Sequence, residues 1–191
     1  MRARNCWKDW TTKRLRVVFI HGPVAAGKHT IGSLLSVRTG LPLFHNHLCV
    51  DLARTLFEFG SEGFTQLRAE IWRAAFAAAA TADTSFIFTF NPEASVDPKL
   101  IDQLVGIIET PGGEICFVEL KASRETILRR LGNDSRAKFG KLVDRELFRQ
   151  IESAGGFEFP PLPSPLLVVD TDRVNAGEAA MAIEQALGRV A

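Results

Sequence analysis

The sequence is short of the features that mark several classes of protein. Only three of its 191 residues are cysteines (Cys6, Cys49 and Cys116), and they are odd in number and far apart. This excludes a disulfide framework and a cysteine-based zinc cluster, and it is typical of a reducing, cytoplasmic compartment. No apolar run approaches the roughly 18 residues that a membrane-spanning helix needs, so no membrane segment is predicted.

An excess of charge of one sign is also missing. The chain has 23 Lys and Arg residues against 22 Asp and Glu residues, a net charge of +1. Such a balance gives no general attraction to nucleic acid or to an anionic membrane, so neither is expected as a partner. The basic residues near the start are followed by polar residues and not by an apolar core, so no signal peptide is predicted. We expect an N-terminal extension over residues 1–14 and one domain over residues 15–191.

Short apolar runs alternate with segments of helical character along the chain. The runs lack polar alternation, as expected of parallel strands that are covered on both faces. Predicted strands are residues 16–20, 43–44, 85–90, 114–120 and 166–169. Predicted helices are residues 28–39, 51–59, 64–82, 98–109 and 124–131, with a last helix after Asn175. This alternation predicts an α/β fold of three layers, with a parallel sheet between helices.

Capping residues mark several of the predicted helix starts. Asp97 precedes a proline in the first-turn position, and Ser123 precedes the helix over residues 124–131. Asn175 and Glu178 have the spacing of a capping box ahead of the last helix. Residues 159–165 contain four prolines and are expected to form a stiff loop.

The clearest functional motif follows the first predicted strand. Glycine, four residues, glycine and lysine (Gly22 to Lys28) stand between a strand and a helix, which is the context that a phosphate-binding loop requires. The glycines let backbone N–H groups curl around phosphates, the helix adds its positive end, and Lys28 adds a mobile charge. We therefore expect an ATP-type nucleotide here. The candidate nucleotide-binding residues are Gly22, Pro23, Val24, Ala25, Ala26, Gly27, Lys28, His29 and Thr30.

The position of a metal ion is harder to predict. The hydroxyl residue that usually follows the lysine is replaced by His29, and Thr30 comes one position later. We expect Mg²⁺ to be bound through water, and its protein ligands stay unassigned. Asp170 follows an apolar run, but it lies late in the chain and is predicted to be a turn or cap residue.

These motifs resemble those of small P-loop kinases. The stretch from Gly27 to Leu35 and the segment over residues 120–131 are similar to shikimate kinases, and Lys28-His29-Thr30 resembles the corresponding loop of adenylate kinases. The resemblance implies sheet order 2-3-1-4-5 and phosphoryl transfer from ATP. It further implies that Arg130 and residues 168–171 lie beside the adenine. A lid at about residues 132–141 would carry Arg136 to the transferring phosphate; the alternative is a basic surface loop.

Departures from shikimate kinases concern the acceptor. Those enzymes carry acidic residues after the second strand, where this chain has His45, Asn46 and His47. Their glycines and arginine after the third strand are replaced here by a segment that includes Asn91, and Thr65 occupies the place of a further arginine. Shikimate is therefore not the expected acceptor.

Residues at the carboxyl end of the second strand are instead candidates for binding another small acceptor. We include His45, Asn46 and His47, with Arg54 and Asn91; a polar turn is the alternative for the first three. Asp51 is the first candidate for the catalytic base and His47 the second. Asp51 is equally explained as a first-turn helix residue, and Arg54 as its surface partner.

Two further groups of basic residues have simpler interpretations. All four histidines (His21, His29, His45 and His47) fall in one short region, but a Zn²⁺ or Fe²⁺ site there would lack a nearby acidic ligand. Arg68 and Arg73 are expected on a solvated helix face.

The hypothesis is an ATP-dependent phosphotransferase that uses Mg²⁺ and acts on a small hydroxylated or phosphorylated metabolite. Lys28, the loop N–H groups and Arg136 would neutralise charge, and the protein would be a monomer or homodimer. Two alternatives stay open: a nucleotide hydrolase or nucleotide- or RNA-end kinase, and a nucleotide-binding regulatory protein without turnover.

Overall fold

A five-stranded parallel sheet forms the centre of the computed structural model, which describes residues 15–132 and 144–188. Its strand order is β2-β3-β1-β4-β5, which confirms the predicted order. All four pairings in the sheet are parallel. The strands are β1 (Arg16–His21), β2 (Leu43–His45), β3 (Phe86–Phe90), β4 (Glu114–Lys121) and β5 (Leu167–Asp170).

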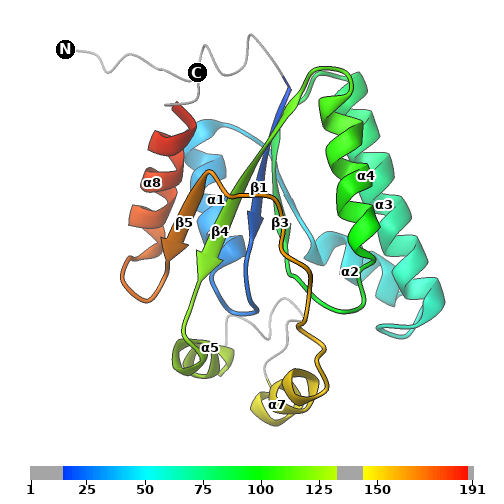
Figure 1. The fold of residues 1–191 in the computed structure, drawn as a ribbon, viewed down its shortest axis with the longest axis vertical. Coiled ribbons are helices and arrows are strands. Elements are labelled where there is room, and N and C mark those ends of the chain that lie inside the picture. The colour runs from blue at the N-terminus through cyan, green and yellow to red at the C-terminus, as the bar shows by residue number, and fades with distance from the viewer. Residues whose placement is uncertain (1–14, 133–143, 189–191) are drawn as a thin grey trace.

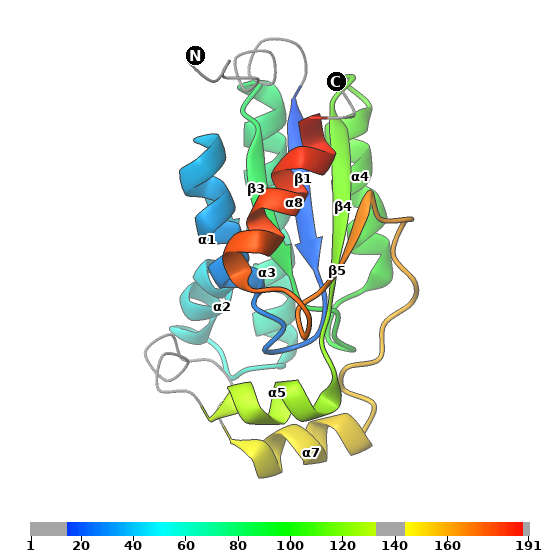
Figure 2. The same ribbon diagram turned by 90° about the vertical axis from the view of Figure 1, so that its left-hand side faces the viewer.

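Helices cover both faces of the sheet, as Figure 1 shows. Helices α1 and α8 pack on one face, and α3 and α4 pack on the other. Helices α5 and α7 lie beyond the carboxyl ends of the strands, where Figure 2 shows them side by side. The helices are α1 (Lys28–Thr39), α2 (His47–Arg54), α3 (Glu62–Thr81), α4 (Pro98–Glu109), α5 (Arg124–Leu131), α7 (Arg145–Ser153) and α8 (Ala176–Gly188).

The two faces of the sheet are filled by different kinds of side chain. Toward α1 and α8 the core is mainly aliphatic. Toward α3 and α4 it is aromatic: the Phe19 ring lies 5.1 Å from that of Phe88 and 4.8 Å from that of Phe117. Because such pairs add about 0.5–1.5 kcal/mol each beyond their burial, the aromatic cluster holds β1 firmly between β3 and β4. The loop after β1 therefore starts from a rigid base.

Several helix caps agree with the sequence. Asp97 and Ser123 accept hydrogen bonds from the backbone N–H groups of Lys99 and Thr126, respectively, as their positions predict. Helix α3 begins at Glu62 and not at residue 64, because Ser61 caps it by accepting a bond from Phe64 N.

Two helices differ from the sequence prediction. The helix predicted at residues 51–59 is α2 (His47–Arg54), because Asn46 already has helical backbone angles and the chain turns into a helix directly after β2. The helix ends at Arg54, and the Thr55 hydroxyl that follows donates to the Leu52 carbonyl. Helix α7 was not predicted at all, although Asp144 caps it in the usual way.

Within the part of the chain that the structure describes, no helix combines the length and the apolar character needed to cross a membrane.

Candidate active site

The predicted phosphate-binding loop joins the carboxyl end of β1 to α1. Gly22 has φ of +147°, and a Cβ there would overlap the carbonyl oxygen of Leu120 on β4. Gly27 is the N-cap of α1 with φ of +93°, and Ala25 between them has φ of +61°. Such positive values are sterically costly for a residue with a side chain, so this curl is held by its surroundings.

Those surroundings are the helices beyond the sheet. Ala25 packs in a small apolar cluster with Ile127 and Leu131 of α5 and with Phe148 of α7. The tip of the loop is therefore supported by the two helices that lie beyond the carboxyl ends of the strands (Figure 2).

The Lys28 ammonium group lies against this loop. Its Nζ donates to the carbonyl oxygens of Gly22 at 2.6 Å and Pro23 at 2.7 Å. A third bond, 3.2 Å long, reaches Oδ1 of Asn91, which follows β3. The lysine thus links the loop to the neighbouring strand.

The N-terminus of α1 suits an anion. No side chain caps it, and its first turn has no acidic residue. A helix end of this kind carries a partial positive charge and backbone donors, which together attract phosphate. Thr30 is exposed and His29 is half-buried in this first turn.

Arg130 joins three segments beside the loop. Its guanidinium donates to Thr171 Oγ1 at 2.9 Å and to the Thr171 carbonyl at 2.7 Å. It also donates to the Ala25 carbonyl at 3.4 Å. The structure therefore brings together the arginine and the residue 168–171 segment that the resemblance implied for the adenine. Asp170 is the last residue of β5, and its Oδ1 accepts from Asp172 N in the turn that follows, so it acts as the predicted cap residue.

His21, at the end of β1, is buried with only 8% of its surface exposed. Burial, together with the positive charge of Lys28 as the smaller cause, lowers the pKa of this imidazole to about 4. His21 is therefore neutral at pH 7, and its ring lies beside Phe19 and Phe117. It ends β1 directly before the loop.

The remaining histidines, His29, His45 and His47, form a cluster at the same edge of the sheet. The rings of His29 and His45 are 4.6 Å apart, and those of His45 and His47 are 6.1 Å apart. Strand β2 ends at His45 and α2 begins at His47, so the two do not continue one strand. Asn46 between them is buried, and its Oδ1 finds no hydrogen-bond partner among the described residues.

This histidine cluster does not form a metal site. Across residues 15–132 and 144–188, no group of three or more His, Cys, Asp or Glu side chains is arranged to hold a metal ion. Asp51 and Arg54, the candidate base and its neighbour, are exposed on α2.

Arg68 lies in the core, contrary to the prediction of a solvated face. It is 1% exposed, because Phe64, Arg68 and Trp72 follow one another at four-residue intervals on the buried stripe of α3. Its Nη1 is 2.5 Å from Oε1 of Glu93. Sequence reasoning missed this pair, and the apolar spacing around Arg68 was the signal for it.

Arg136 lies outside the described residues, as does the predicted lid after Gly132. The lid and the role of Arg136 stay predictions.

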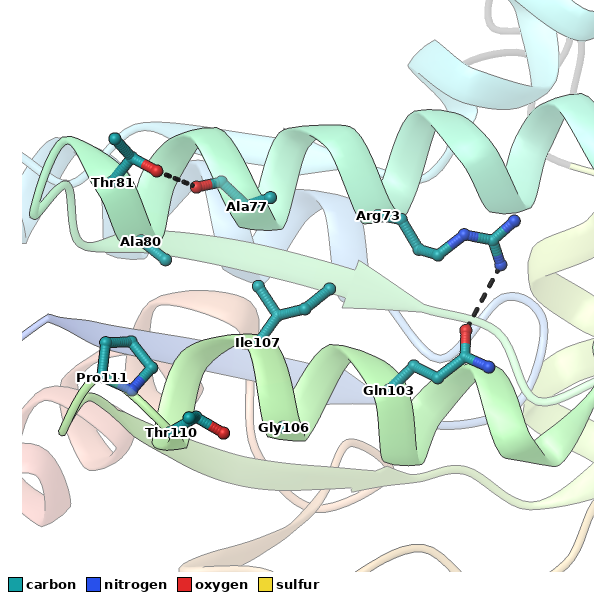
Figure 3. Close-up of a pocket in the computed structure, with 9 residues that line it drawn as sticks. All are labelled: Arg73, Ala77, Ala80, Thr81, Gln103, Gly106, Ile107, Thr110 and Pro111. Atoms are coloured by element: carbon teal, nitrogen blue, oxygen red, sulfur yellow. Dashed lines mark hydrogen bonds between the residues drawn. The ribbon is translucent and has the colours of Figure 1, made fainter.

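An open groove on the described surface lies elsewhere. It runs between α3 and α4 and contains none of the loop residues, as Figure 3 shows. Its lining is Arg73, Ala77, Ala80, Thr81, Gln103, Gly106, Ile107, Thr110 and Pro111. The groove is not part of the site at the carboxyl edge.

Comparison with known proteins finds the same architecture among kinases. No family profile and no curated protein matches the sequence. A sugar kinase from a Janibacter species superposes with a TM-score of 0.64 at 18% identity, covering 91% of this chain and 94% of the other. The Mycobacterium tuberculosis APS kinase, solved with AMPPNP and APS, has a TM-score of 0.63 at 14% identity, covering 91% of this chain and 98% of the other. Shikimate kinase from Acinetobacter baumannii, solved with shikimate, has a TM-score of 0.55 at 17% identity, covering 95% of this chain and 96% of the other.

The sheet order, the loop after β1 and these superpositions agree with one another. The chain has the fold of the P-loop small-molecule kinases.

Proposed function

We propose that this protein transfers the γ-phosphoryl group of ATP to a hydroxyl group of a small metabolite. The observation that carries the proposal is the loop from Gly22 to Gly27 with the Lys28 ammonium against it and an uncapped helix behind it. These are the groups that cradle the β- and γ-phosphates in P-loop enzymes. On binding, the phosphate oxygens would replace the loop carbonyls as acceptors for Lys28.

The adenine is proposed to lie beside Arg130. The guanidinium is held in place by its bonds to Thr171 and Ala25, so one face of the base would meet a rigid planar group. Thr171 follows β5 and His45 ends β2, and these strands are the two opposite edges of the sheet. The adenine and the acceptor would therefore lie on opposite sides of the phosphates.

The acceptor is proposed to bind at the histidine cluster. His29 is the residue after Lys28, and its ring contacts His45, so this cluster lies next to the phosphate site. Asn46 Oδ1 is buried without a hydrogen-bond partner among the described residues, and a hydroxyl of the bound acceptor would supply one. Asp51 is the proposed base, with His47 as the alternative, and Arg54 would face an anionic group of the acceptor.

Catalysis would consist of positioning and charge neutralisation. Lys28 and the end of α1 face the charge that develops on the transferring phosphoryl group, and Arg136 is proposed to add to them. Mg²⁺ bound with the nucleotide would offset part of the negative charge of the phosphates. We propose that it contacts the protein through water, and its direct protein ligands stay unassigned.

The test combines ATP binding with a screen of acceptors. Sugars, aminoglycosides, nucleosides and other small metabolites are assayed for ATP-dependent phosphorylation, with Lys28→Ala as the site variant. We expect the variant to lose turnover and to bind ATP about tenfold more weakly or worse, because charge-assisted bonds to phosphate are lost. Lys99→Ala, an exposed lysine on α4, is the matched control and should retain both properties.

The outcomes separate the competing hypotheses. Unchanged ATP binding by Lys28→Ala would contradict the phosphate site itself. ATP binding without phosphate release, whatever the acceptor, would identify a regulatory protein, and release without any acceptor would identify a hydrolase.

A further inference from the structure

The residues that follow β3 connect the phosphate site to a buried charge pair. Arg68 is fully buried, with its guanidinium 5.2 Å from the Phe64 ring and 5.4 Å from the Trp72 ring. It donates to Glu93 Oε1 at 2.5 Å and to the Ser95 carbonyl at 2.9 Å. A buried cation with two acceptors and two aromatic faces has little freedom to move. Glu93 is therefore fixed by a rigid partner.

Glu93 presents its second oxygen to Asn91. Its Oε1 is taken up by Arg68 and by the Ser95 hydroxyl at 2.9 Å, while Oε2 lies 3.5 Å from Asn91 Nδ2. The last contact is long, but it places a negative charge beside the donor end of the amide. The carboxylate therefore favours the amide orientation in which Nδ2 of Asn91 faces Glu93.

The amide of Asn91 has one donor end and one acceptor end, and its two charged neighbours have opposite signs. With Nδ2 toward the Glu93 carboxylate, Oδ1 faces the Lys28 ammonium and accepts its bond at 3.2 Å. The reversed amide would place its NH₂ group against the ammonium and its oxygen against the carboxylate, and both contacts would be repulsive. The Glu93 carboxylate, together with the Pro92 carbonyl at 3.5 Å from Nδ2, therefore favours the orientation that serves Lys28.

We propose that Asn91 is a positioning residue for Lys28 and that the Arg68–Glu93 pair holds it in the required orientation. The functional part of this inference depends on the proposed function, because Lys28 is assigned there to the phosphates of ATP. A neutral amide at this place directs the ammonium without neutralising it. An aspartate would pair with Lys28 and offset the charge that the phosphates meet.

The first experiment needs no nucleotide. The side-chain amide signals of Asn91 are assigned by NMR in the ligand-free protein and followed in Glu93→Gln and Lys28→Met. Both variants are expected to shift these signals, because each removes one of the two charges that orient the amide. Glu109→Gln, which removes an exposed acid at the end of α4, should leave them in place. If the Asn91 amide signals have the same chemical shifts in Glu93→Gln as in the wild type, the inference is wrong.

The second experiment measures coupling in ATP affinity. Glu93→Gln is expected to weaken ATP binding about tenfold in the wild-type background and to have almost no effect when Asn91 is alanine. Asn91→Asp should also weaken binding, whereas Glu109→Gln should not. A purely structural role of Glu93 predicts equal losses in both backgrounds, and that result would contradict the proposal.

Together the two experiments distinguish a failure of the proposed function from a failure of this inference. If the wild-type protein binds no ATP, the proposed function is wrong and the functional part of this inference falls with it. The amide signals would still support or overturn the contact between Glu93, Asn91 and Lys28.

Discussion

At the scale of single residues, His21 shows how the site affects stability. It ends β1 directly before the loop, and its Nε2 has no hydrogen-bond partner among the described residues. Burial holds its pKa at about 4, against 6.5 for an exposed imidazole. Between these two values the unfolded chain binds a proton that the folded chain does not. Folding is therefore opposed as the pH falls through this range.

We predict that His21 makes the protein acid-sensitive. Above pH 6.5, His21 does not reduce the free energy of unfolding. As the pH falls from 6.5 to 4, the free energy of unfolding decreases progressively, by up to about 3 kcal/mol. Urea unfolding of the wild type and of His21→Gln at pH 7.5, 6 and 5 measures this effect, and the stability difference between them should shrink as the pH falls. His47→Gln, which keeps His21, should show the wild-type dependence. Parallel losses in the wild type and His21→Gln would contradict the prediction.

The roles of single residues could be predicted where they depend on neighbours in the sequence. The positive φ values at Gly22 and Gly27 agree with the use of glycine in the motif. Arg68 was misplaced because its charge was weighed above its position between Phe64 and Trp72 on one helix face. Its partner Glu93 lies 25 residues away in a loop, and no local pattern indicates such a pairing.

At the scale of elements, the start of α8 is stabilised by its own sequence. Asn175 Oδ1 accepts from Gly177 N at 2.9 Å and from Glu178 N at 3.0 Å. The Glu178 carboxylate accepts from Asn175 N at 2.9 Å in return. Both halves of a capping box are thus formed, as the spacing predicted. The helix they begin covers the aliphatic face of the sheet, where Ala180 and Ile183 are fully buried.

We predict that Asn175→Ala destabilises the protein by about 1 kcal/mol, because the backbone donors of the first turn lose their acceptor. Asn175→Ser, which keeps a capping oxygen, should retain most of the stability. Equilibrium unfolding in urea is the measurement. Equal stability of the alanine and serine variants would show that the cap contributes nothing.

Boundaries of elements were predicted less well than their order. The change from strand to helix takes place at Asn46, whose helical backbone angles start α2 at His47 and not at residue 51. Helix α2 ends at Arg54, whereas the prediction extended it to residue 59. The first and last residues of an element depend on single hydrogen bonds, and the periodicity of the sequence does not predict them.

At the scale of the whole molecule, nucleotide binding should be visible as stability. A ligand at 100 times its Kd stabilises the folded state by about 2.7 kcal/mol. For a chain of this size that corresponds to a rise in Tm of roughly 5–10 °C. We predict such a shift with ATP and Mg²⁺ in differential scanning fluorimetry for the wild type and Lys99→Ala, and its loss in Lys28→Ala. An equal shift in Lys28→Ala would place the nucleotide elsewhere.

Local sequence determined the strands, most helix caps and the loop with its glycines and lysine, because each of these depends on residues close together in the chain. Tertiary structure alone decided which distant side chains meet. Lys28 reaches Asn91 across 63 residues and Arg130 reaches Thr171 across 41. The physical reason is that a parallel sheet gathers the carboxyl ends of all its strands at one edge, and the packing of the helices, which no short segment encodes, sets the distances there.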